Sequence, residues 1–153
     1  MVIIPARKSR LIKEKQPFAP VDTARKIYGS TLNMCIKMPK RYTYLVLKET
    51  IELAGKVMDY TKMANSVFPT NQHEAQIRRD YWIMARSSLQ ALSSRIDRFI
   101  EMPDALSYKF EDTGKVVHVT INELNELADL IISEMSLITN QLESEEKRFK
   151  DLK

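Results

Sequence analysis

Apolar side chains recur at steps of three and four residues through a long stretch that contains no proline or glycine. The stretch runs from Asn71 to Met102. Its stripe consists of Ile77, Tyr81, Ala85, Leu89, Leu92, Ile96 and Phe99, and Trp82 and Met84 widen it. This spacing places the apolar residues on one face of a single long helix. The sequence therefore predicts a helix that offers the stripe to a core and keeps its arginines off it.

Two segments before this helix show the same period. The first can be capped by Asp22 or Thr23 and runs to about Lys37. The second runs from about Pro39 or Arg41 to about Ser66, with apolar residues on two adjoining stripes. Two stripes indicate burial on a broad face, as inside a bundle or at a contact between subunits.

A fourth helical segment runs from about Thr120 to about Lys150. Thr120 followed three residues later by Glu123 has the spacing of a capping box. The apolar seam of this helix consists of Leu124, Leu127, Ile131, Met135, Ile138 and Leu142. Its glutamates, Glu134 and Glu145 among them, are assigned to the solvated side.

Two segments interrupt the helical pattern. Residues 1–20 form a basic arm broken by three prolines, and it is either a solvated tail or a segment that lies on phosphate or on a neighbouring subunit. From Ser107 to Thr120, apolar and polar residues alternate around Asp112-Thr113-Gly114, which predicts a small hairpin or an extended loop.

These elements predict an all-α fold, an antiparallel up-and-down four-helix bundle over residues 21–153. The basic N-terminal arm precedes it, and a small hairpin-like insertion lies before the last helix. A chain of 153 residues can bury one core, and its three glycines argue against an all-β fold.

Cysteine and hydropathy bear on the compartment. Cys35 is the single cysteine, which excludes an internal disulfide framework and fits a reducing, cytoplasmic environment. It falls in a helical pattern, so we expect a buried thiol rather than a nucleophile. No apolar run approaches the roughly 20 residues that span a bilayer, so no membrane association is expected.

The order of several motifs resembles a known family. A KIYGSTLNM stretch leads into a corner at Lys37, Pro39, Lys40 and Arg41; YLVLKETIELAGKVMD follows, and then YWIMARSSLQALSSRI. This pattern, from about Thr23 to Lys150, is similar to the four-helix bundle proteins encoded in intervening sequences of ribosomal RNA genes. That family includes Avd, the accessory protein of diversity-generating retroelements. The resemblance implies a homopentamer with a basic surface and, in the Avd branch, binding to a reverse transcriptase and its template RNA. The arm and the insertion before the last helix depart from the family pattern.

Catalytic and metal-binding motifs are absent from the sequence. His73 and His118 are far apart, no Glu-x-x-His pair of a di-iron bundle occurs, and no P-loop, dinucleotide-binding or nucleophile-elbow motif is found. We therefore expect no metal, no cofactor and no enzymatic activity.

Basic residues suggest one class of partner. The net charge is +4, and we expect cations of the arm, of the corner and of the long helix to bind nucleic-acid phosphates. The candidate residues are Lys37, Lys40, Arg41, Arg78, Arg79, Arg86, Arg7, Lys8 and Arg10. The predicted function is a non-catalytic accessory protein that binds RNA or DNA, assisting a reverse transcriptase. The alternative is a protein-interaction or assembly subunit of a mobile element, a phage or a conjugative mobilisation system, without nucleic-acid contact.

Overall fold

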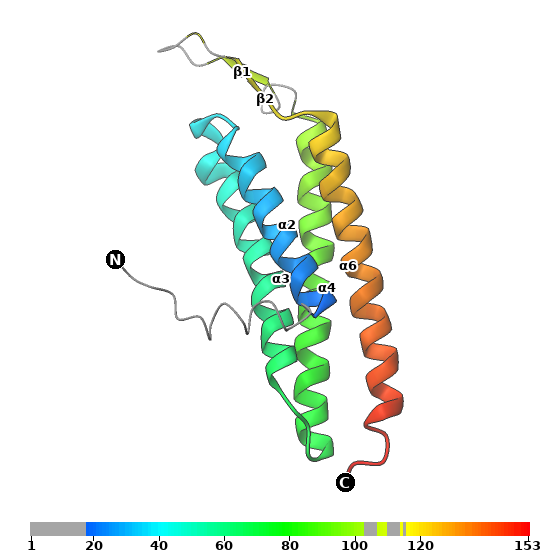
Figure 1. The fold of residues 1–153 in the computed structure, drawn as a ribbon. Coiled ribbons are helices and arrows are strands. Elements are labelled where there is room, and N and C mark those ends of the chain that lie inside the picture. The colour runs from blue at the N-terminus through cyan, green and yellow to red at the C-terminus, as the bar shows by residue number, and fades with distance from the viewer. Residues whose placement is uncertain (1–17, 103–106, 110–113, 115) are drawn as a thin grey trace, which may run out of the picture.

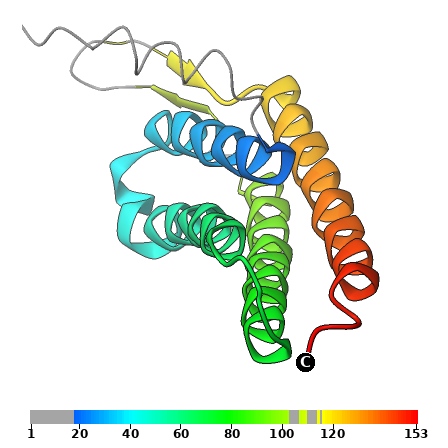
Figure 2. The same ribbon diagram turned by 60° about the horizontal axis from the view of Figure 1, so that its bottom comes forward.

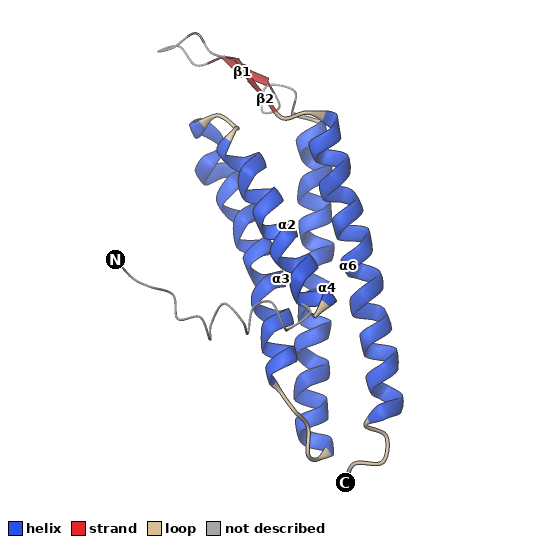
Figure 3. Ribbon diagram, in the orientation of Figure 1, coloured by secondary structure: helices blue, strands red, loops and turns tan. Residues whose placement is uncertain are grey.

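Four long helices make up most of the structure. The computed structural model describes residues 18–102, 107–109, 114 and 116–153. Its helices are α2 (Ala19–Ile36), α3 (Lys48–Ser66), α4 (Gln72–Ile100) and α6 (Ile121–Arg148). Figure 3 shows that helix dominates the described chain, which confirms the all-α prediction.

The helices form a ring in which each contacts two neighbours. α2 packs against α3 and α6, and α4 packs against the same two helices. Consecutive helices run in opposite directions in Figure 1. Figure 2, in which the bottom of that view comes forward, shows the four helices beside one another. The corner between α2 and α3 lies at the same end as the connection from α4 to α6 (Figure 1).

A small hairpin lies in that connection. Strand β1 (Ser107–Lys109) pairs antiparallel with β2 (Val116–His118). Both strands fall in the segment for which the sequence predicts a hairpin or an extended loop. Val119, however, is buried in the core, and Thr120 caps α6. The last two residues of the predicted insertion therefore belong to the bundle.

The first helix begins earlier than predicted. α2 starts at Ala19, its N-cap is Phe18, and Pro20 lies in its first turn. Proline is tolerated there because the first backbone N–H groups of a helix have no partner within it. Pro20 thus helps to open a helix, and the proposed boundary at residue 20 falls inside an element. Asp22 is not the cap; its carboxylate accepts a hydrogen bond from Arg25 at 2.7 Å, which lowers the pKa of Asp22.

The second predicted helix is regular only in part. A 3-10 turn, η1 (Lys40–Tyr42), and a π-helical segment, η2 (Thr43–Leu47), precede α3. Pro39 has extended backbone angles, φ −58° and ψ 140°, so it separates α2 from this turn. The single helix predicted from the corner to Ser66 is therefore wrong at its start.

Side-chain caps fix the starts of the other two helices. The Asn71 side chain accepts a hydrogen bond from the Glu74 backbone N–H at 2.9 Å. Thr120 and Glu123 form the predicted capping box, with the Thr120 hydroxyl accepting from the Glu123 N–H at 3.1 Å. Each cap satisfies backbone donors that the helix itself leaves unpaired.

The core centres on the apolar face of α4. Trp82, Leu89 and Leu92 have no exposed surface, and Phe99 is 2% exposed. Buried Thr31 and Thr61 donate to backbone carbonyls of their own helices, and Thr50 of α3 donates to the carbonyl of Val46 in η2, at 2.7–2.9 Å. The Cys35 thiol is buried as predicted, and burial raises its pKa to about 12.

One core position holds a carboxyl group. Glu134 is fully buried in α6, and neither of its carboxyl oxygens has a hydrogen-bond partner among the described residues. Burial raises the pKa of Glu134 to about 8, because the charged form loses its hydration. The assignment of Glu134 and Glu145 to the solvated side is wrong, since both are buried.

Replacing Glu134 should change how stability depends on pH. The folded chain holds this proton more tightly than the unfolded chain, so stability falls as pH rises from 4.5 toward 8. Wild type should lose roughly 3 kcal/mol more between pH 5 and pH 8 than Glu134→Gln, which has no proton to release. Urea unfolding at both pH values measures this difference. Glu143→Gln, at an exposed position of the same helix, is the control and should follow wild type. Parallel pH profiles for wild type and Glu134→Gln would contradict the assignment.

Candidate nucleic-acid interface

The predicted phosphate-binding residues do not gather on one surface. Lys37, Lys40 and Arg41 lie at the corner between α2 and α3, whereas Arg79 and Arg86 lie along α4. Arg79 lies in the first third of α4, whose start is at the opposite end of the bundle (Figure 1), and Arg86 lies at the middle of this helix. The arm residues Arg7, Lys8 and Arg10 lie outside the described residues.

The corner exposes two of its three predicted cations. Lys40 and Arg41 are both exposed in the 3-10 turn that follows Pro39. The Arg41 guanidinium lies 5.1 Å from the centre of the Tyr42 ring. Both side chains are exposed where the chain passes from α2 to α3. A long anionic strand can therefore reach them without displacing core residues.

Lys37 is already paired inside the chain. Its ammonium donates to the carboxylate of Glu123, in the first turn of α6. This contact lowers the pKa of Glu123 and joins the end of α2 to the start of α6. A phosphate at Lys37 would have to compete with Glu123, so the residue is a weaker candidate than its exposed neighbour Lys40.

Arg78 is buried and serves the fold. It is 5% exposed, and its Nε donates to the Glu145 carboxylate. Its Nη1 donates at 2.9 Å to the carbonyls of Ala64 and Val67, at the end of α3. Its guanidinium also lies 5.7 Å from the centre of the Trp82 ring. These contacts engage the guanidinium within the chain, so Arg78 is removed from the set of phosphate-binding candidates.

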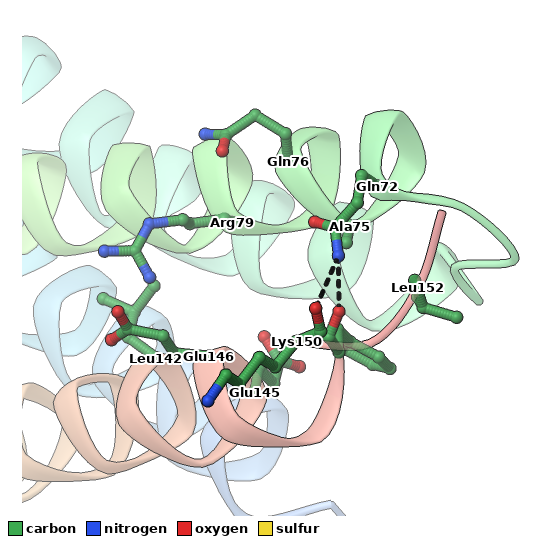
Figure 4. A pocket seen from close by; sticks show the side chains of 10 residues that line it. Gln72, Ala75, Gln76, Arg79, Leu142, Glu145, Glu146, Lys150 and Leu152 are labelled. Atoms are coloured by element: carbon green, nitrogen blue, oxygen red, sulfur yellow. Dashed lines mark hydrogen bonds between the residues drawn. The ribbon is translucent and has the colours of Figure 1, made fainter.

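Arg79 faces a pocket between the start of α4 and the end of α6. The pocket has a volume of about 570 Å³, and its lining includes Arg79, Glu146 and Lys150. Figure 4 shows Arg79 reaching from α4 toward Leu142 and Glu146. Gln72 donates across the pocket to the carbonyls of Phe149 and Lys150, at 2.7 and 3.3 Å. Acidic and basic groups thus share this pocket, so it is a less favourable phosphate site than the corner.

Arg86 lies seven residues after Arg79, two turns along the same side of α4. It is half-buried and has no ion pair among the described residues. By contrast, Arg95 pairs with Glu49 of α3 at 3.2 Å rather than with its sequence neighbour Asp97. Arg86 therefore stays a candidate, although it is remote from the corner.

The partner of Arg78 was missed from the sequence. Glu145 continues the three- and four-residue spacing of the α6 seam, three residues after buried Leu142. A glutamate at a seam position, with an arginine on the stripe of a neighbouring helix, is the signal for such a pair. Residue type alone assigns both side chains to the surface.

Similarity to known proteins, metal ligands and membrane-crossing helices are three further possible guides to function. Comparisons with family models, curated proteins and solved structures found no match for the chain. Among the described residues, no group of three His, Cys, Asp or Glu side chains could hold a metal ion. None of the helices in that part of the chain is long and apolar enough to cross a membrane.

Arg78→Met should destabilise the fold strongly. Glu145 would be left as a buried charge without its main partner, at an expected loss of about 3–5 kcal/mol. Thermal or urea unfolding measures this loss. Arg79→Met, at the adjacent half-buried position, is the matched control and should lose much less.

The double variant Arg78→Met/Glu145→Leu separates a paired charge from simple packing. Removing both charges leaves no unpaired ion, so the double variant should be more stable than Arg78→Met alone. An Arg78→Met chain as stable as wild type would contradict the structural role of Arg78.

Proposed function

We propose that this protein is a non-catalytic nucleic-acid-binding accessory protein built as an antiparallel up-and-down four-helix bundle. The observation that carries the proposal is the exposed pair Lys40 and Arg41 on a turn at the end of the bundle. Lysine and arginine side chains displace condensed counterions when they contact phosphates, which gives binding that tolerates different sequences.

The proposed partners follow from the resemblance to the Avd and ribosomal intervening-sequence family. In that reading, the protein assists a reverse transcriptase and its template RNA in the cytoplasm. The motif order around the corner and the long third helix supports this assignment. The buried thiol of Cys35 is compatible with a reducing compartment.

Exposed apolar residues support a homo-oligomer, which we propose to be a pentamer. Leu32 and Ile36 are 39% and 68% exposed on α2, and Ile121 and Ile132 are 74% and 65% exposed on α6. A ring of five copies has head-to-tail interfaces made of two different surfaces, which two helices can supply. Trp82 and Tyr60, by contrast, contact residues of their own chain, since Trp82 is buried and Tyr60 stacks on Tyr81.

The same apolar residues favour the second candidate function, an assembly subunit that makes no nucleic-acid contact. In that case the exposed apolar side chains would bind other proteins of a mobile element or phage. The two functions differ in what neutralising the corner does, so one binding experiment separates them.

Neutralising the corner should weaken nucleic-acid binding. Lys40→Gln/Arg41→Gln removes two phosphate contacts, which should reduce the slope of log K against log salt by about 1.4 for a single strand. Fluorescence anisotropy with RNA and DNA oligonucleotides, over a series of salt concentrations, measures the slope. Arg79→Gln/Arg86→Gln tests the α4 residues in the same way.

The matched control is Arg25→Gln/Lys26→Gln. It removes the same net charge from adjacent exposed residues that both pair with Asp22, at 2.7 and 3.2 Å. Its slope should stay close to that of wild type. If wild type binds neither RNA nor DNA, or if the control and both test pairs behave alike, the assembly-subunit function replaces nucleic-acid binding.

The oligomer should be sensitive to charge at Ile132. Light scattering of wild type should give about five times the 17.8 kDa mass of one chain. Ile132→Lys should lower that mass because it places a charge in an apolar contact. Ser133→Lys, at the next exposed position, should leave the mass unchanged. A wild-type monomer at micromolar concentration would contradict the proposed oligomer.

A further inference from the structure

An aromatic ring stands in solvent beside the cations of the corner. Tyr44 is 85% exposed, the highest value among the exposed large hydrophobic side chains of the described residues. Other aromatic side chains have partners: Tyr60 stacks on Tyr81, and Phe18 packs against Trp82 at 6.1 Å between ring centres. The exposure of Tyr44 thus leaves a ring face available to a ligand.

Tyr44 lies in the π-helical segment that precedes α3. Tyr44 and Leu45 are consecutive and are 85% and 70% exposed, whereas Val46 is half-buried and Leu47 is buried. A π turn accommodates an extra residue relative to an α turn, so it shifts the position at which the following helix meets the core. Single π turns of this kind occur frequently at functional sites.

Two lysines flank this ring in the sequence. Lys40 precedes Tyr44 by four residues and Lys48 follows it by four, and both are exposed. Neither forms an ion pair within the described part of the chain. The nearby carboxylate of Glu49 is engaged by Arg95 at 3.2 Å. The two lysines on either side of the ring in the sequence are therefore exposed and form no ion pair with a described residue.

We propose that Tyr44 is a stacking platform for an unpaired base of a single strand whose phosphates lie on Lys40 and Lys48. The proposal rests on the proposed nucleic-acid binding and deepens it by assigning the strandedness and a base contact. Any base presents a π face, so a tyrosine ring with lysines on either side binds single strands without reading their sequence. A duplex keeps its bases stacked inside and offers such a ring only its backbone.

The charge of the surface favours this occupant over another copy of the chain. A second copy placed here would bury Lys40 and Lys48, and burying a charge without a partner is unfavourable. A phosphate backbone supplies the compensating charge and the aromatic partner together. A contact between two copies of the chain at this surface is a separate outcome of the experiment described next.

The experiment compares Tyr44→Ala with Tyr44→Phe. The probes are a labelled polyuridine strand of about 12 nucleotides and an RNA duplex of the same length. Tyr44→Ala should weaken single-strand binding by about 5- to 150-fold, as expected for one lost stacking contact, and should leave duplex binding unchanged. Tyr44→Phe keeps the ring and should bind like wild type. A strand containing 2-aminopurine should lose fluorescence on binding wild type and Tyr44→Phe but not Tyr44→Ala.

Phe68→Ala is the matched control. Phe68 is 79% exposed at the other end of α3, and the arginines that share its pocket, Arg78 and Arg148, are both paired with Glu145. It should bind both probes like wild type.

Three results would overturn the assignment of Tyr44. The first is Tyr44→Ala binding like wild type while Lys40→Gln/Arg41→Gln binds weakly, which leaves the proposed function standing. The second is a lower oligomer mass for Tyr44→Ala, which would make the ring a contact between copies. The third is no binding of either probe by wild type, which would remove the proposed function as well.

Discussion

The buried contact between Arg78 and Glu145 holds one end of the bundle together. α2 is shorter than the other long helices and begins partway along the bundle (Figure 1). A pocket lined by Phe18, Phe68, Arg78 and Gln141 lies beyond its start, and Arg78 on α4 contacts both α3 and α6 there. It pairs with Glu145 on α6, donates to the last carbonyls of α3, and lies on the Trp82 ring that Phe18 also touches. An apolar side chain could fill this space but could not satisfy the carbonyls that end α3.

The two buried glutamates of α6 show how a partner decides the effect of burial. Glu145 meets a guanidinium and also accepts from Gln141 at 3.1 Å, so its charge is compensated where it is buried. Glu134, about three turns earlier, has no such partner, and its pKa is raised to about 8. Of these two glutamates on one helix, Glu145 therefore forms an ion pair between helices, whereas Glu134 lowers the stability of the fold as pH rises.

Local signals in the sequence were sufficient for α4, α6 and the cap of α6, because short-range patterns determine them, but not for the starts of α2 and α3. The Thr120 capping box and the apolar stripe of α4 follow from spacing alone. Met135, predicted in the α6 seam, packs half-buried against the core, whereas its neighbour Glu134, assigned to the solvated side by its residue type, is the fully buried position. The pairing of Arg78 with Glu145 joins positions 67 residues apart, so spacing can place each side chain on a core stripe but cannot show that the two meet. The π turn at the corner depends on how α2 and α3 meet, which is a property of the tertiary fold.

The positions of the cations show that arginines along one helix need not form a binding surface. A count of arginines along α4 suggests a charged face, but Arg78 is buried in an ion pair with Glu145 and Arg95 pairs with Glu49. The positive groups of Lys40 and Lys48 stand where α2 gives way to α3 through irregular turns, beside an exposed ring. On α4, Arg78 and Arg95 reach acidic partners on neighbouring helices, whereas Lys40 in the irregular turn is exposed and forms no ion pair with a described residue. For this reason the corner, rather than the longest basic helix, is the surface on which the proposed nucleic-acid binding depends.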